Sequence, residues 1–172
     1  ASGGPGADPS WTAVAGVGFR GDQPIEVQGE EAIFTDAPRG FFLKGRVRAW
    51  QGKSLLLANQ VNGEESEARL SAAGAVRTLI DLQKDTPTEM TEVIADFLTY
   101  RKQEASVTFT GGVRLTQGTR TLTCDELVAD LDEAQQMRSM RGTGKVRLRD
   151  TLAGRSIEAR TATYDVGAES IE

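Results

Sequence analysis

Hydrophobic and polar residues alternate over long stretches of this chain, and this alternation predicts β-strands. Side chains point to opposite faces of a strand at successive positions, so a period of two marks a strand with one apolar face. The residues of one predicted apolar face are Phe41, Leu43, Gly45, Val47 and Ala49. The residues of a second are Val107, Phe109, Gly111, Val113 and Leu115. The intervening positions are mostly polar or charged, as expected for a face in contact with water.

A first motif recurs along the chain: an aliphatic residue, a small residue two positions on, and two large or apolar residues at the fifth and seventh positions after the start. It occurs as Val27-x-Gly29-x-x-Ala32-x-Phe34, Val93-x-Ala95-x-x-Leu98-x-Tyr100, Leu122-x-Cys124-x-x-Leu127-x-Ala129 and Ile157-x-Ala159-x-x-Ala162-x-Tyr164, and less completely from Leu56. One extra residue inside the motif shifts the phase of the alternation. A β-bulge or a bend has this effect on a strand.

A second motif, Gly-x-Val, follows the first at a steady distance. The glycine comes 18 positions after the start of the first motif in three repeats, at Gly45, Gly74 and Gly111, and 22 positions after it in the fourth, at Gly144. Such regular spacing indicates an internal repeat. A glycine on an apolar face predicts a close approach between strands.

Turn residues separate the predicted strands. Asn62-Gly63 is the strongest short hairpin signal, and further turns are expected at 36–40, 51–52, 117–118 and 152–154. The segment Asp81–Thr91, which contains Pro87, predicts the longest loop. Residues 89–103 have some helical character, but they match the repeat and are interpreted as a strand.

The predicted fold is all-β, with about nine or more strands stacked by repeat. The pattern is compatible with a β-sandwich, with a jelly roll opened along one side, or with a short solenoid. The length of 172 residues is enough for one domain with a substantial core.

The composition of the chain argues against several classes of function and kinds of site. The net charge is −5, which argues against a general nucleic-acid binder. The chain has no His and a single Cys, so the commonest general base is missing and neither an intrachain disulfide nor a multi-thiolate metal site is possible. No apolar run is long enough to span a membrane. We therefore expect no catalytic residues, no metal and no cofactor.

Three further features have ordinary structural interpretations. Cys124 takes the small-residue place of the first motif, which predicts a buried thiol. The stretch Gly142-Thr-Gly-Lys145 lacks the spacing and the hydroxyl residue of a phosphate-binding loop. Basic residues gather late in the chain and are read as a solvated face, with phosphate binding as the alternative: Arg138, Arg141, Lys145, Arg147, Arg149, Arg155 and Arg160.

Several phrases resemble the LptA/OstA family of periplasmic lipopolysaccharide-transport proteins. The family's Gln-Pro-Ile start is matched by Gln23-Pro24-Ile25, and its apolar-Thr-Gly-x-Val-x-x-x-Gln-Gly phrase by residues 109–118 and, less well, by 43–52. The small-Asp-x-aliphatic phrase occurs at Ala95–Leu98 and Cys124–Leu127. The resemblance covers Gly21 to Glu172. Arg46, Arg48 and Trp50 depart from it at outward positions.

The resemblance implies an open β-jellyroll, a splayed sandwich with an apolar interior trough, over residues 21–172, preceded by a flexible or partly ordered segment over residues 1–20. The fifth repeat begins at Ile157, and its glycine would fall beyond Glu172. We therefore expect the domain to be cut short at its C-terminal end, or its last strand to lack a partner.

The trough would shelter the acyl chains of lipopolysaccharide, because each methylene removed from water contributes about 0.8 kcal/mol. A closed core made of the same residues is the alternative. The predicted lining residues are Ile25, Val27, Phe34, Phe41, Leu43, Val47, Leu79, Leu98, Tyr100, Phe109, Val113 and Leu115.

The function implied by the resemblance is that of a non-enzymatic periplasmic lipid carrier. It would pass lipopolysaccharide toward the outer membrane and so take part in outer-membrane biogenesis. Its partners would be lipopolysaccharide and, through edge strands, other jellyroll transport components or further copies of itself. The alternative is a structural or protein-interaction β-repeat that assembles through its edges without lipid. A glycan-active enzyme is a third hypothesis, which the scattered carboxylates do not favour.

Overall fold

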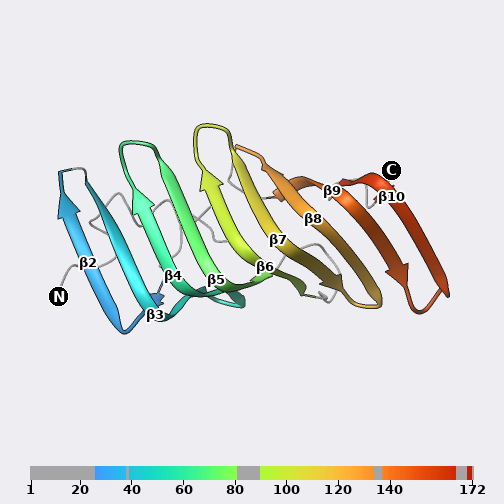
Figure 1. The fold of residues 1–172 in the computed structure, drawn as a ribbon, viewed down its shortest axis with the longest axis horizontal. Helices are drawn as coiled ribbons and strands as arrows, with labels where there is room; N and C mark the ends of the chain where they lie inside the picture. The colour runs from blue at the N-terminus through green and yellow to red at the C-terminus, as the bar shows by residue number, and fades with distance from the viewer. Residues whose placement is uncertain (1–25, 38, 81–89, 134–136, 166–169, 172) are drawn as a thin grey trace.

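The strands lie side by side in nearly the same order as in the chain. The computed structural model describes residues 26–37, 39–80, 90–133 and 137–165 and the backbone of 170–171. They form one open antiparallel sheet in the order β1-β3-β4-β5-β6-β7-β8-β9-β10-β11, with β2 also paired to β3 (Figure 1). The bounds are β1 Glu26–Gln28, β2 Glu31–Asp36, β3 Arg39–Gln51, β4 Ser54–Glu64, β5 Arg69–Ile80, β6 Thr91–Arg101, β7 Ser106–Gln117, β8 Arg120–Leu131, β9 Met137–Asp150, β10 Arg155–Asp165 and β11 Ser170–Ile171.

Each long strand from β3 to β10 bends near its middle, as the phase shift in the first motif predicts. The pairing register shifts at these points, for example between Thr110 and Val113 of β7 opposite β8. The bends of β3, β5, β7 and β9 centre on the glycine of the Gly-x-Val motif, which has φ between +79° and +84°. The next residue is also left-handed, with φ between +47° and +55°. Few residues other than glycine adopt the first of these conformations.

The motif glycine lies against a polar side chain of the neighbouring strand. Gly111 faces Asp96, and a Cβ atom added to Gly111 would lie 2.6 Å from Asp96 Oδ2. A similar relation holds at the other three bends, where the polar partner is Asn59 of β4, Asp125 of β8 or Glu30, which lies between β1 and β2. The atoms nearest to these glycines therefore belong to a polar side chain, whereas the sequence predicted a close approach of opposing strands.

The bend lets both halves of a strand contribute to one core. In β6, Val93 and Ala95 are buried before the bend, and Leu98 and Tyr100 are buried after it. The strand has one extra residue at the bend, so the apolar residues after the bend lie on the same inner face as those before it. Buried residues from β3 to β9 form one hydrophobic cluster. The predicted all-β, open jellyroll-like fold is confirmed.

One predicted turn is wrong. Asn62 and Gly63 lie inside β4, and the chain turns at 65–68 instead. Gly63 is required there because the ring of Phe41 packs directly against its Cα. Turns are confirmed at 52–53, 118–119 and 151–154, and 91–101 is a strand as predicted. The predicted 81–91 loop falls largely outside the described residues, as does the segment 1–20.

Candidate functional site

An apolar groove lies at the C-terminal end of the sheet, between the two halves of the last bent strands. Each wall is formed by the strand halves on one side of the bends. The first wall consists of Leu115, Leu122 and Leu148. The second wall, formed by the halves on the other side of the bends, consists of Leu127, Met140, Gly142, Ala162 and Tyr164. Gln117, Arg120 and Thr163 add polar atoms at the rim. The groove is open at its mouth, and its cavity volume is about 40 Å³, well below the roughly 300–1,000 Å³ of small-molecule pockets.

The strand register explains why leucines line one wall. Leu115 of β7 pairs with Leu122 of β8, which in turn pairs with Leu148 of β9. Directly paired residues share a face, so these side chains form one apolar row across three strands. On the other wall, Gly142 packs closely against Leu122 and Cys124, since a Cβ atom at Gly142 would lie 3.4 Å from Leu122 Cδ2 and from Cys124 Sγ.

Most residues predicted to line a trough lie in the hydrophobic core. Phe41, Leu43, Val47, Leu98, Tyr100, Phe109 and Val113 are buried. Val27 and Leu115 are partly buried against this core, and Leu115 also lines the groove. Phe34 is 48% exposed at the N-terminal end of the sheet.

The two remaining predicted trough residues are Leu79, which lies outside this core, and Ile25. Leu79 is partly exposed between the buried Thr78 and Ile80, and it pairs with Leu55 and Glu92. It therefore lies on the outer face of the sheet, because the side chains of adjacent strand residues point to opposite faces. Ile25 lies outside the described residues.

The sequence reasoning missed most of the groove residues, although their pattern was visible. Leu122, Leu127, Ala162 and Tyr164 all occupy places in the first motif. Every repeat carries the same signal, so the motif alone could not indicate which repeat is open. In the structure the inner face is buried in the middle strands and more exposed at β10, where Ile157 is 55% exposed.

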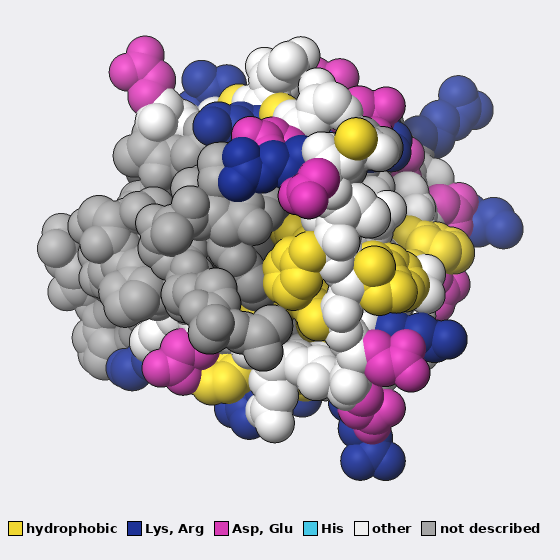
Figure 2. Space-filling model, turned by 90° about the vertical axis from the view of Figure 1, so that its left-hand side faces the viewer, with side chains coloured by type: hydrophobic (Ala, Val, Ile, Leu, Met, Phe, Trp, Pro, Cys, Tyr) yellow, Lys and Arg dark blue, Asp and Glu magenta, His cyan; other side chains and the backbone are white. Residues whose placement is uncertain are grey.

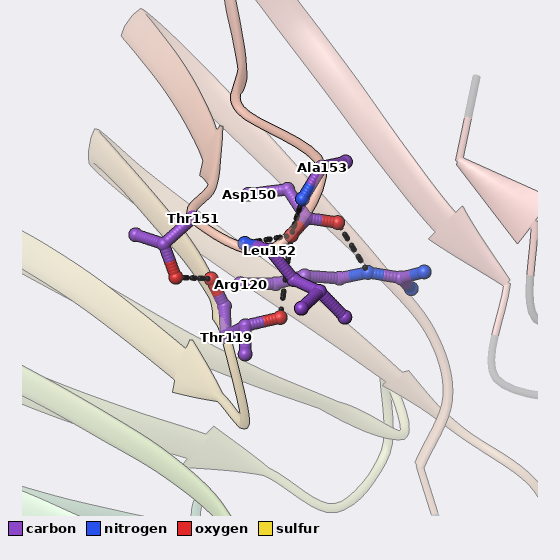
Figure 3. A network of polar contacts seen from close by, with 6 residues as sticks. All are labelled: Thr119, Arg120, Asp150, Thr151, Leu152 and Ala153. Carbon is purple, nitrogen blue, oxygen red and sulfur yellow. Dashed lines mark hydrogen bonds and ion pairs between the residues drawn. The ribbon is translucent and has the colours of Figure 1, made fainter.

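A polar network fixes one end of the groove (Figure 3). The carboxylate of Asp150 accepts hydrogen bonds from the backbone N–H groups of Leu152 (3.0 Å) and Ala153 (3.2 Å) and from the Thr119 hydroxyl (3.2 Å). Its second oxygen lies 3.5 Å from Arg120 Nε. The N–H of Ala153, with Thr119, Leu152 and the charge of Arg120, holds the pKa of Asp150 below its ordinary value.

This network predicts an acid-sensitive contribution to stability. Because the pKa of Asp150 is lowered by folding, its stabilisation is complete above the unfolded value near pH 4 and is lost as the pH falls through the folded value. We expect Asp150→Asn to lower the urea midpoint of unfolding at pH 7 and to change it much less at pH 3. Glu104→Gln, at an exposed turn carboxylate, should have little effect at either pH. An equal shift for Asp150→Asn at both pH values would contradict this prediction.

Cys124 is a buried free thiol, as predicted. Burial, helped by the charge of Asp125, raises its pKa to about 11, so the thiol stays protonated at neutral pH. The late basic residues are all exposed, as expected for a solvated face. Arg147 pairs with Glu158 at 2.7 Å.

The two ends of the sheet expose strand edges. Among the described residues β2 pairs only with β3, and it is exposed along its whole length. Figure 2 looks onto this end and shows hydrophobic side chains among charged ones; Ile33 is 53% exposed there. At the other end, β10 pairs with β9, and among the described residues its free side meets only β11, at Tyr164 and Asp165.

The described part of the chain contains no group of three or more acidic or Cys side chains placed to hold a metal ion. It also contains no helix of the length and apolar character needed to cross a membrane.

Two of three comparisons with known proteins find a similarity. A profile of the family described as "LptA/(LptD N-terminal domain) LPS transport protein" matches residues 92–172, which include the groove. A search of curated protein sequences finds no match. Among solved structures, a similar chain is LptH from Pseudomonas aeruginosa, described as the LptA-homologous periplasmic component of the lipopolysaccharide transport device. Its TM-score is 0.53 at 22% identity, covering 67% of this chain and 78% of LptH. The profile match relates residues 92–172 of this chain to the LptA/LptD N-terminal family of lipopolysaccharide transport proteins, and the structural match shows that the chain shares the fold of an LptA homologue.

Proposed function

We propose that this protein is a periplasmic carrier that shelters lipopolysaccharide acyl chains in the apolar groove between β7 and β10. The observation that carries the proposal is the groove itself. Its walls are made of leucine, methionine, alanine and tyrosine side chains, and its mouth is open. The choice of lipopolysaccharide as the cargo rests on the matching profile, which describes a family of lipopolysaccharide transport proteins.

The groove suits a carrier because its affinity would come from apolar contact. Each methylene withdrawn from water contributes about 0.8 kcal/mol, so a chain that lies partly in the groove is held without a single dominant contact. The binding free energy is therefore spread over the methylenes of the acyl chain. A ligand held in this way can pass in steps to another apolar surface.

The open edges support the remaining part of the proposal, that the carrier contacts other transport components. Unpaired backbone N–H and C=O groups of an edge strand can pair with a strand of another chain. The side of β10 from Arg155 to Thr163 is available for this among the described residues. A partner added there would lie next to the groove and could extend it.

The proposal is tested by photocrosslinking at two adjacent positions of β7. A photoreactive amino acid at Leu115 would face the groove, whereas one at Arg114 would face the solvent on the outer side. We expect purified lipopolysaccharide to crosslink at 115 at least about tenfold more than at 114, since the two side chains lie on opposite faces. Circular dichroism would confirm that both variants are folded.

Two outcomes would count against lipid carriage. Equal crosslinking at 114 and 115 would indicate nonspecific adhesion of lipid. No crosslinking at either position of a folded protein, combined with concentration-dependent assembly, would favour the second candidate function, a β-repeat that joins partners through its edges. The exposed side of β10 is the observation behind that candidate.

A further inference from the structure

We propose that Arg120 binds an anionic headgroup at the rim of the groove, so that the groove takes amphiphiles which carry a phosphate beside their acyl chain. This inference rests on the proposed function and makes its ligand more specific. It begins from the position of Arg120, the one charged residue among the described residues that line the groove, whose side chain is 51% exposed. The residue can therefore reach both the groove and the solvent.

The Arg120 side chain is held in place but is not saturated. Its Nε atom lies 3.5 Å from Asp150 Oδ2, which is a long contact for an ion pair. The two terminal nitrogens of the guanidinium group point away from Asp150 (Figure 3), and the described residues provide no partner for them. A guanidinium group has five N–H donors, so most remain for a ligand.

The negative charge of Asp150 does not prevent Arg120 from binding an anion, because the Asp150 carboxylate has other hydrogen-bond partners. The oxygen Oδ1 accepts three hydrogen bonds, from Thr119 and from the backbone of Leu152 and Ala153. These bonds tie Asp150 to the turn between β9 and β10 and to the turn between β7 and β8. The role of Asp150 is thus to fix these turns and to orient Arg120.

A second arginine stands across from the same carboxylate. Arg155 of β10 pairs in register with Asp150, which pairs on its other side with Arg120. Directly paired residues share a face of the sheet. Two cations therefore flank one carboxylate at the end of the groove, and the local charge is positive in a chain whose net charge is negative.

The chemistry favours phosphate as the anion. Guanidinium groups bind phosphate through two parallel hydrogen bonds, which are shorter and stronger than neutral ones. An alkyl chain in the leucine-lined groove would place a phosphate at its end within reach of the rim. The apolar walls and the arginine thus recognise two parts of one ligand.

The test compares three probes: dodecyl phosphate, dodecyl maltoside and inorganic phosphate, with both detergents below their micelle concentrations. Binding to the full chain is measured by calorimetric titration. We expect the wild-type protein to bind dodecyl phosphate about tenfold or more tightly than dodecyl maltoside, as one charge-assisted contact allows. Arg120→Gln should remove this difference by weakening dodecyl phosphate binding.

The matched control is Arg149→Gln. Arg149 is an exposed arginine of β9 that pairs with Thr121, next to the groove residue Leu148 and on the opposite face. Its loss removes the same charge from the chain but should not change either affinity. Arg120→Lys, which keeps the charge but loses the planar fork, should retain part of the preference for dodecyl phosphate.

The results separate this inference from the proposed function. If both detergents bind equally and Arg120→Gln changes neither affinity, the headgroup site is wrong and the apolar groove stands. If inorganic phosphate binds as tightly as dodecyl phosphate, the inference also fails, because the alkyl chain then adds nothing. If neither detergent binds, both the groove as a lipid site and the headgroup site are overturned.

Discussion

Gly111→Ala is expected to lower the free energy of unfolding by about 2–5 kcal/mol, the sum of backbone strain and overpacking. Gly111 has a φ of +84° at the bend of β7, a conformation that an L side chain rarely adopts. The new Cβ atom would also lie 2.6 Å from Asp96 Oδ2 and 2.7 Å from Asp96 Cβ. Urea unfolding followed by circular dichroism measures the loss.

The next residue provides the control. Gly112 has a φ of +55°, and a Cβ atom there would meet nothing within 4 Å. Ala75 holds the equivalent place in β5 with a φ of +50°. We therefore expect Gly112→Ala to cost only about 1 kcal/mol. Equal losses for the two variants would show that the contact with Asp96 and the more extreme φ of Gly111 do not matter.

Phe109→Ala should destabilise the protein by about 3–5 kcal/mol, the usual range for removing a buried aromatic ring. Phe109 is fully buried in β7, where it pairs with the buried Leu98 and Leu127. Truncation would leave a cavity between these strands that the two bent halves cannot easily close. The same urea experiment measures the change.

Phe97→Ala makes the same chemical change on the opposite face. Phe97 is 54% exposed and pairs with Thr110, the neighbour of Phe109. Its loss removes little buried surface, so we expect a change of about 1 kcal/mol or less. A large loss at Phe97, or a small one at Phe109, would mean that the inner and outer faces are wrongly assigned.

The repeat made the bends predictable. The phase shift at Asp96-Phe97 predicts a bulge, and the register shifts between β6 and β7 at this place. The polar residue after the small one had no assigned role, because its partner is far away in the sequence. Asp96 meets Gly111 only when β6 and β7 pair.

The turn predicted at Asn62-Gly63 is wrong because a contact with a residue distant in the sequence outweighs the local turn propensity. Asn62-Gly63 has the composition of a tight hairpin, yet both residues lie inside β4. The glycine serves the ring of Phe41 on the neighbouring strand. Turn propensity considers only adjacent residues, so it could not include this packing.

The sequence alone determined the class of structure: an all-β chain, bent strands, the residues that face inward, and the family resemblance. Period-two alternation and repeated motifs are local properties, and local backbone geometry converts them directly into strands. Only the tertiary structure decided which part of the inner face is closed and which is open. Phe109 and Leu115 belong to the same alternating face of β7, but one is fully buried in the core and the other lines the groove. This difference depends on how far the two halves of the last strands stand apart, which no local pattern records. It also brings Arg120, which no motif singled out, to the rim of that groove.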